Sequence, residues 1–329
     1  MSTAEPTVAP TPTVSESAVP RLLRRLRTGD EIARLVTLAS AVGIVLLTGL
    51  LVYELWQTSA ESRHKFGWEF LTSQEWDPVA RQYGALPFLY GTVVTAAIAL
   101  LLAVPVGLGS AMFLSELAPP RLSDALTFLI ELLAAVPSVI YGLLGRFVLV
   151  PVVLEPIVVP VLQKTLGFLP IFSGHFYGVS LFSAGAVLAI MIVPFIVSVS
   201  REVLLAVPID QREGSLAVGA TRWETTWKVV VPFARKGIYG SIFLALARAL
   251  GETMAVTMVV GNSPQITKSL LAPGYTAAAV IANEFAEAFD KLEISALIEL
   301  GLMLFGLTIV INALARLLIL TTSRQGSAT

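Results

Sequence analysis

Residues 181–200 read LFSAGAVLAIMIVPFIVSVS, twenty positions without a charged side chain. About 20 apolar residues in an α-helix are enough to cross the hydrocarbon core of a bilayer, so this stretch predicts a membrane-spanning helix. The whole 329-residue composition agrees, because 55% of the residues are hydrophobic and 14% are charged, against about a quarter charged in soluble domains. With a mean hydropathy of +0.79, we expect an all-α integral membrane protein.

Five further apolar spans flank this one, which makes six. They lie at 35–53, 92–114, 125–145, 237–260 and 296–318. The first is longer than the about 7–15 apolar residues of a signal peptide and begins deep in the chain, so we predict that it is retained. The stretch 147–177 is apolar but contains four prolines, which favours a short amphipathic or re-entrant segment on the outer side over a seventh span.

The distribution of basic residues supports six spans with both termini in the cytoplasm. This topology places fourteen Lys and Arg residues on the cytoplasmic side and seven on the outer side, with Arg248 inside a span. A seventh span would separate the basic region 201–236 from the basic cluster at 21–27. We therefore expect a disordered cytoplasmic tail with a basic cluster at 1–30, a transmembrane domain at 31–320 and a cytoplasmic tail at 321–329.

Two classes of chemistry are not expected in this chain. It has no cysteine, and His64 and His175 lie far apart without a cluster of other ligands, so we predict no metal site. The phosphate-binding pattern GxxxxGK[ST] is also absent; the nearest string, 267–269, lacks the glycine before its lysine. The chain itself should hydrolyse no ATP.

The loop 207–233, between the fourth and fifth spans, is predicted to form two short helices. Gly219 suits the left-handed position that ends the first helix. Thr221 followed by Glu224 is a capping box that begins the second helix, and Pro232 is expected to end it. The sequence therefore predicts a helix–turn–helix element at the cytoplasmic face.

The spacing within this loop carries a family resemblance. Counted from Glu213, Gly219 follows at six, Val229 at sixteen, Val231 at eighteen and Pro232 at nineteen. This pattern resembles the "EAA" loop of ABC-importer permeases, in which a glycine follows the glutamate at six and an aliphatic-x-aliphatic-Pro string ends the motif. An interfacial loop without a partner is the alternative, but it explains none of these offsets.

In that family the loop inserts into a cleft of a separate cytoplasmic ATPase. Gly214 and Ser215 stand where the family usually has two alanines, and both are small enough for close docking. The resemblance therefore implies that ATP and magnesium are bound by the partner ATPase and that this chain has no cofactor of its own. The residues to which it assigns coupling are Glu213, Gly214, Ser215, Gly219 and Pro232.

Arg248 is the charge that the bilayer makes most costly. It lies eleven residues into the span 237–260, roughly 16 Å at 1.5 Å per residue, near the midplane. A charge at that depth normally faces the bundle interior or a water-filled path. We interpret Arg248 as the group that meets an anion in transit. Glu252 is four residues further on, hence expected on the same helical face, and would limit how tightly the anion is held. Thr253 is a nearby hydrogen-bond donor. The alternative is a structural ion pair.

Two more strings sharpen the resemblance: ELLAAVPSVIYG at 131–142 and RALGETMAV at 248–256. With the loop, they resemble the PstC-type permease of the bacterial high-affinity phosphate importer, over about 86–262. The resemblance implies a type I ABC-importer fold in the cytoplasmic membrane and matches Arg248 and Glu252 to the charged pair of the family's fifth span. It implies as partners a PstA-type permease, PstB-type ATPases, a PstS-type binding protein and the lipid bilayer, and no nucleic acid.

Three alternatives remain open. One buried arginine does not distinguish phosphate from sulfate or molybdate, so a permease for another oxyanion is the nearest. A secondary anion transporter using Arg248 and Glu252 as a relay predicts flux that is independent of an ATPase. A membrane scaffold or sensor would have no use for charges at the midplane.

Overall fold

The computed structural model describes residues 30–325, and the chain divides into two units after Glu54. The first unit holds most of α2, the helix Asp30–Thr58. The second unit holds all the elements that follow. The predicted N-terminal tail with its basic cluster lies outside the described residues, apart from Asp30 at the start of α2. The last helix, α15 (Lys291–Gln325), continues through part of the region predicted as a C-terminal tail.

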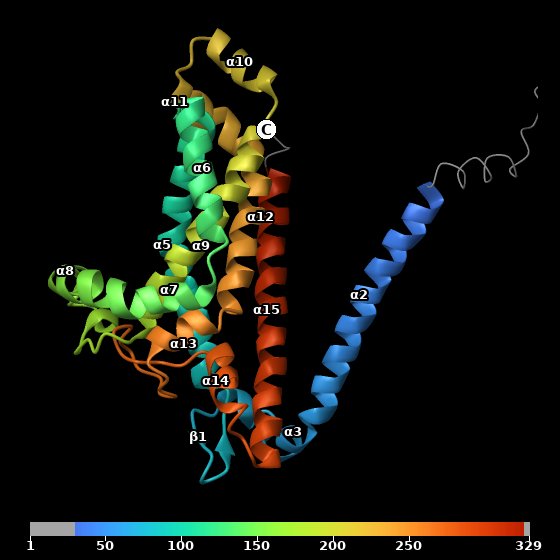
Figure 1. Cartoon of the computed structure of the whole chain (residues 1–329), viewed down its shortest axis with the longest axis vertical. Coiled ribbons are helices and arrows are strands. Elements are labelled where there is room, and N and C mark those ends of the chain that lie inside the picture. The colour runs from blue at the N-terminus through green and yellow to red at the C-terminus, as the bar shows by residue number, and fades with distance from the viewer. Residues whose placement is uncertain (1–29, 326–329) are drawn as a thin grey trace, which may run out of the picture. The chain divides into compact units, whose positions relative to one another are not determined.

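Six helical segments of the described chain are long and apolar enough to cross a membrane, which confirms the predicted number. They are Glu31–Thr58, Leu86–Leu117, Ser138–Leu166, Leu181–Leu205, Arg222–Leu250 and Lys291–Leu317. Within the second unit, α5 (Leu86–Met112), α9 (Leu181–Leu205), α12 (Val231–Leu250) and α15 run along the long axis of the view (Figure 1). The third and fifth segments differ from the predicted spans.

The third apolar segment begins later than expected. The predicted span 125–145 is divided between α6 (Pro120–Ala134) and α7 (Ser138–Leu144), because Pro137 disfavours helix at the residue before it and has no N–H to donate. Helix then continues through a π-helical stretch, Gly145–Val158, into α8 (Val159–Leu166). The prolines of this region are accommodated rather than helix-breaking, and α7 and α8 run across the bundle in Figure 1.

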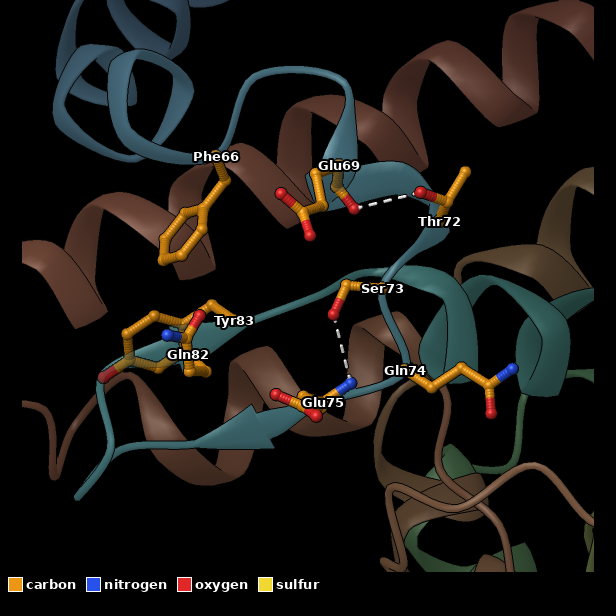
Figure 2. Close-up of a pocket in the computed structure, with 8 residues that line it drawn as sticks. All are labelled: Phe66, Glu69, Thr72, Ser73, Gln74, Glu75, Gln82 and Tyr83. Carbon is orange, nitrogen blue, oxygen red and sulfur yellow. Dashed lines mark hydrogen bonds between the residues drawn. The ribbon is translucent and has the colours of Figure 1, made fainter.

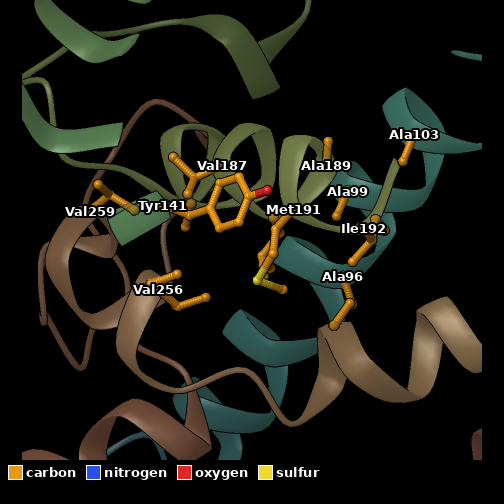
Figure 3. Close-up of a cluster of buried hydrophobic side chains, with 14 of the residues drawn as sticks. Ala96, Ala99, Ala103, Tyr141, Val187, Ala189, Met191, Ile192, Val256 and Val259 are labelled. Carbon is orange, nitrogen blue, oxygen red and sulfur yellow. The ribbon is translucent and has the colours of Figure 1, made fainter. Parts of the chain in front are cut away.

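Close packing of α5 on α9 forms the centre of the second unit. Ala96, Ala99 and Ala103 of α5 are buried against α9, the most buried of the long segments (Figure 3). Gly107 leaves no space for a side chain, since a Cβ there would lie 2.7 Å from Ile196. Small residues at such contacts let helix backbones approach closely, which is the main source of packing between helices in lipid.

The second unit has two ends that matter for function. The loop end carries α10 (Ile209–Ala217) and α11 (Arg222–Thr225), and the hairpin end lies opposite it (Figure 1). The hairpin end comprises α3 (Ala60–Phe66), α4 (Glu69–Thr72), the antiparallel strands β1 (Trp76–Asp77) and β2 (Gln82–Tyr83), and α14 (Ala277–Glu284).

Aromatic rings attach the hairpin to the helices. Trp76 packs edge-on against Phe88 of α5 at a centroid distance of 4.8 Å and against Tyr83 at 4.9 Å. Phe88 in turn meets Tyr275, just before α14, at 5.5 Å. Edge-to-face pairs at such distances add to the stability gained by burial, so the hairpin is part of the packed unit.

Candidate transport path and coupling loop

The loop 207–233 contains the two predicted helices and the predicted turn. Gly219 has a φ of +89°, in the left-handed region that favours glycine. The Thr221 hydroxyl accepts from the Glu224 N–H at 3.2 Å, and the Glu224 carboxylate accepts from the Thr221 N–H at 3.0 Å. Both halves of the capping box are therefore present, as predicted.

The prediction that Pro232 ends the second helix is wrong. Helix continues from Arg222 through a π-helical turn, Thr226–Val230, directly into α12. Pro232 lies in the first turn of α12, where a missing N–H costs least. The end of the loop is therefore continuous with the helix that carries Arg248.

One arginine fastens the first loop helix to the bundle. Arg212 of α10 donates to both carboxylate oxygens of Glu116, at 3.0 and 3.2 Å, and Glu116 lies in the π-helical end of the second span. The same guanidinium donates to the carbonyls of Leu204 at 2.8 Å and Val207 at 2.5 Å, at the end of α9. Arg212 therefore joins three elements, because the planar guanidinium can reach several acceptors at once.

The neighbouring residues that the family pattern singled out differ in their surroundings. Glu213 is exposed, and among residues 30–325 its side chain makes no hydrogen bond or ion pair. Gly214 has open space around its Cα. Ser215 instead bonds to the Thr225 hydroxyl at 3.0 Å and so links the two loop helices. Glu213 and Gly214 thus form a surface that is free to meet a partner, and Ser215 holds that surface in shape.

The mostly polar helix α10 also exposes large apolar side chains. None of its residues is buried, although they include Ile209 and Leu216, and Val218 follows directly. Several large apolar side chains exposed together commonly mark an interaction surface. The loop end therefore has the chemistry expected of a docking element: a free carboxylate, a glycine and apolar side chains on a fastened helix.

The fifth span is interrupted beside Arg248. The helix predicted over 237–260 ends at Leu250 and resumes as α13 (Met254–Val260). Glu252 lies in the interruption, one residue before the N-cap Thr253, and its carboxylate accepts a hydrogen bond from the Ala255 N–H in the first turn of α13 at 3.1 Å. The expectation that Arg248 and Glu252 share one helical face is wrong, because the helix has ended between them. Broken helices at membrane depth are tolerated where they are buried or line a water-filled path.

Arg248 is half-buried on α12. In the described part of the chain no carboxylate lies within 4.0 Å of its guanidinium. Its Cζ lies 6.0 Å from the ring centroid of Phe195, and Tyr141 is near enough to interact with it electrostatically. An unpaired guanidinium among aromatic rings has unused donors for an anion.

A second helix interruption lies in the same region. The gap 135–137 between α6 and α7 precedes Tyr141, and Gly142 of α7 packs so closely on α13 that a Cβ there would be 3.0 Å from the Ala255 Cα. Thr253 makes only a 3.3 Å bond to the Gly251 carbonyl, so its hydroxyl is weakly held. Two broken helices therefore meet next to the unpaired arginine, an arrangement that transporters use for substrate sites.

Three charged residues that are important for the structure were not identified from the sequence. Arg212 and Glu116 are ninety-six positions apart, and no local pattern indicates that they meet. Glu299 is 1% exposed in α15, and its Oε2 has no hydrogen-bond partner in the part that the structure describes. A carboxylate inside an apolar span was a visible signal in that case. Among residues 30–325 there is no group of three His, Asp or Glu side chains that could hold a metal ion.

Comparison with known proteins gives one family and a consistent set of relatives. The family model described as "Binding-protein-dependent transport system inner membrane component" matches residues 103–323. A phosphate transport system permease protein PstC of Mesorhizobium japonicum is 44% identical over 309 residues, covering 93% of this chain and 94% of the relative. A PstC of Haemophilus influenzae is 48% identical over 294 residues, covering 88% and 93%.

A more distant relative and a solved structure extend the comparison. The PstC 2 of Mycobacterium tuberculosis is 39% identical over 302 residues, covering 89% of this chain and 93% of the relative. The fold is similar to a chain of the MetNI methionine ABC transporter in an inward-facing conformation, with a TM-score of 0.53 and 15% identity. That match covers 72% of this chain and 95% of the other, and it concerns the fold alone.

Proposed function

The chain belongs to the family of binding-protein-dependent transport system inner membrane components, and from that premise we propose that it is the membrane-spanning permease subunit of an ATP-driven phosphate importer. Two features support this role. The exposed, fastened loop helix α10 suits a partner ATPase, and the unpaired Arg248 suits an anionic cargo. The fold and the loop serve any importer of this type, so Arg248 is the observation that carries the choice of an anion.

The permease domain at 31–320 has its loop end in the cytoplasm and its hairpin end outside, with both termini cytoplasmic. This orientation agrees with the basic residues of the loop end and the acidic residues of the hairpin end. The partners are a PstA-type permease, PstB-type ATPases and a PstS-type binding protein, and the ATPases bind ATP and magnesium. This chain contributes the path and the coupling surface of Glu213, Gly214, Ser215, Gly219 and Pro232.

Transport follows an alternating-access cycle. When ATP binding closes the ATPase pair, α10 moves with it, and Arg212 passes the displacement to the ends of α5 and α9. The continuous helix after the loop carries it along α12 to Arg248 and the interruption. In the path, Arg248 binds the phosphate, Glu252 holds the start of α13 and Thr253 offers a weakly held hydroxyl. The positive charge lowers the cost of bringing an anion to that depth.

Uptake of labelled phosphate at low micromolar concentration tests this function. In cells that lack the subunit, wild type should restore uptake, Arg248→Ala should reduce it at least tenfold, and Arg248→Lys should keep part of it because the charge remains. Lys236→Ala is the matched control: it removes an exposed cation from the same helix, far from the interruption. Phosphate uptake by Arg248→Ala equal to wild type would refute the role of this residue.

Sulfate and molybdate uptake, measured in the same cells, separate phosphate from the other oxyanions. If the deletion affects only one of those anions, the permease role stands and the substrate is wrong. Flux that continues without a partner ATPase would favour the secondary transporter instead. We expect neither, since the three compared relatives are all phosphate permeases by name.

A further inference from the structure

A cavity of about 590 Å³ lies between helices near the loop end of the second unit. Its walls come from the last turns of α5, from Leu204 near the end of α9, and from the helical segment between Trp223 and Ile242. Sites for small molecules have volumes of about 300–1,000 Å³, so this cavity is large enough for a ligand. Almost all of its lining is aliphatic or aromatic, and of the described residues that line it Arg235 alone is charged.

The cavity at the hairpin end has the opposite character. It measures about 350 Å³, and four polar side chains contribute to its lining: Glu69, Gln74, Glu75 and Gln82 (Figure 2). Water fills a polar cavity well, because a bound water needs two to four hydrogen-bond partners. The larger cavity offers few such partners. In a membrane-spanning unit it is therefore expected to hold an apolar chain rather than water.

The polar groups of the larger cavity gather at one end. Arg235 lies one turn into α12, whereas Ile242 lies seven residues further along the helix, about 10 Å deeper at 1.5 Å per residue. Trp223 and Trp227 line the cavity on the loop side of Arg235, with their rings edge to face at 5.7 Å. Tryptophan is enriched where a bilayer meets water. The order of charge, indole rings and aliphatic side chains is that of a phospholipid, from its headgroup to its acyl chain.

Arg235 has hydrogen-bond donors that the chain does not use. It is half-buried, and its guanidinium makes no hydrogen bond or ion pair with any residue among 30–325. The segment 222–236 around it holds four Lys and Arg against one acid, Glu224, which pairs with Lys228 at 3.3 Å. A planar guanidinium matches the geometry of a phosphate group. The mouth of the cavity therefore complements an anionic headgroup.

We propose that this cavity binds an anionic phospholipid, with the acyl chain along Leu108 and Ile242 and the phosphate group on Arg235. Apolar contact alone would select no lipid, because every chain of the bilayer makes it equally well. Selectivity comes from the guanidinium. A helix of a second permease could fill the same space, but it would cover Arg235 and leave the charge unpaired unless it brought an acid. The site does not depend on which anion the chain transports.

Quenching of tryptophan emission by brominated lipid tests the site in the complete transporter. In nanodiscs of phosphatidylcholine, a small fraction of the lipid is replaced by brominated phosphatidylglycerol, or in a second sample by brominated phosphatidylcholine. The emission of Trp223 and Trp227 is taken as the difference from Trp223→Phe with Trp227→Phe. We expect the anionic lipid to quench this emission about fivefold more effectively than the neutral one, the preference that one basic residue near the surface supplies.

Two variants separate the site from general attraction to a charged surface. Arg235→Gln should remove the preference for the anionic lipid and leave quenching by the neutral lipid unchanged. Lys236→Ala is the matched control, because it removes an exposed cation one residue on that does not line the cavity, and it should keep the preference. Gly109→Leu places a side chain in open space on the cavity wall, so it should weaken quenching by both lipids.

Three outcomes would overturn the site. They are equal quenching by the two lipids in wild type, an equal loss of preference in Arg235→Gln and Lys236→Ala, and no quenching by either lipid, which would mean that the second permease covers the cavity. A thermal melt of the detergent-purified transporter gives a second readout. Added phosphatidylglycerol should raise the Tm of wild type and Lys236→Ala but not that of Arg235→Gln, because a ligand stabilises only the state that binds it. An equal rise in all three would contradict the proposal.

Discussion

Arg212 and Glu116 face each other with two parallel hydrogen bonds, guanidinium to carboxylate, at 3.0 and 3.2 Å. Both side chains are largely shielded, at 17% and 11% exposure. The pair is the ionic connection between α10 and the second span among the described residues, and the adjacent Glu213 points to solvent. Arg212 thus attaches the loop to the second span, while the next residue, Glu213, is exposed for contact with a partner.

We predict that Arg212→Gln uncouples hydrolysis from transport. The variant loses the ion pair, leaves Glu116 without its partner and keeps the surface that meets the ATPase. Phosphate uptake should fall about tenfold while ATP hydrolysis falls much less, so more ATP is used per phosphate. The ratio is measured in proteoliposomes containing the whole transporter.

Two controls make the role of Arg212 specific. Arg212→Lys should retain part of the coupling, because it keeps the charge but loses the two-pronged geometry. The exchange Arg212→Glu with Glu116→Arg should restore some coupling relative to Arg212→Glu alone. Equal losses of uptake and hydrolysis in every variant would mean that the pair only supports folding or assembly.

Glu252 should act through its hydrogen bond to α13 rather than through its charge. Glu252→Gln keeps an oxygen that can accept from the Ala255 N–H, so uptake should stay within about twofold of wild type. Glu252→Ala removes the acceptor, which for side-chain acceptors at the start of a helix costs about 1 kcal/mol, and should lower both uptake and the thermal stability of the purified permease. A loss in Glu252→Gln as large as in Glu252→Ala would show that the charge itself is needed.

The hairpin end should lose stability as the pH rises from acid. Burial raises the pKa of Glu284, and this is partly opposed by the Trp76 indole, which donates to the carboxylate. The native state therefore holds the proton at pH values where the unfolded chain has released it. Stability is greatest below the ordinary glutamate pKa and falls as the pH rises through the raised one.

Trp76 emission, taken as the difference from Trp76→Phe, reports this titration. Glu284→Gln should remove the transition, because no proton is then exchanged at that site. A transition that persists in Glu284→Gln would assign the titration to another group.

Gly91→Ala should prevent normal packing of the hairpin end. A Cβ at Gly91 would lie 2.0 Å from the Tyr275 carbonyl oxygen, which belongs to the backbone and cannot move aside easily. Gly109→Ala is the control within the same helix, where nothing lies within 4 Å, and alanine there favours helix by about 0.5–1 kcal/mol. Fluorescence-detected size-exclusion chromatography should show little monodisperse Gly91→Ala and normal Gly109→Ala; equal profiles would contradict the predicted clash.

Local patterns in the sequence predicted the fold where one residue decides a conformation. Gly219 and the Thr221–Glu224 box determine the turn and the second helix of the loop, and six apolar runs determine the number of spans. The positions of the third and fifth spans were wrong, because hydropathy does not register where a helix is interrupted. Pro137 and Gly251 interrupt apolar runs without changing their polarity.

From the sequence, the candidate site could be predicted only at residues that are individually unusual for their position. Arg248 stands out because a charge at the midplane is costly, and the structure leaves it without an acidic partner among the described residues. The ion pair of Arg212 with Glu116 could not be predicted, since it depends on how the ends of three helices meet.

The interruption at 251–253 places Arg248 and the hydrogen-bond partner of Glu252 on different helical segments of the same unit. Arg248 belongs to α12, whereas Glu252 lies in the interruption and is bonded to the first turn of α13. Since the helical hydrogen-bond ladder stops between them, bending there breaks none of it. A bend there changes where Arg248 lies relative to Thr253 and the start of α13, so the set of donors that an anion meets depends on an angle.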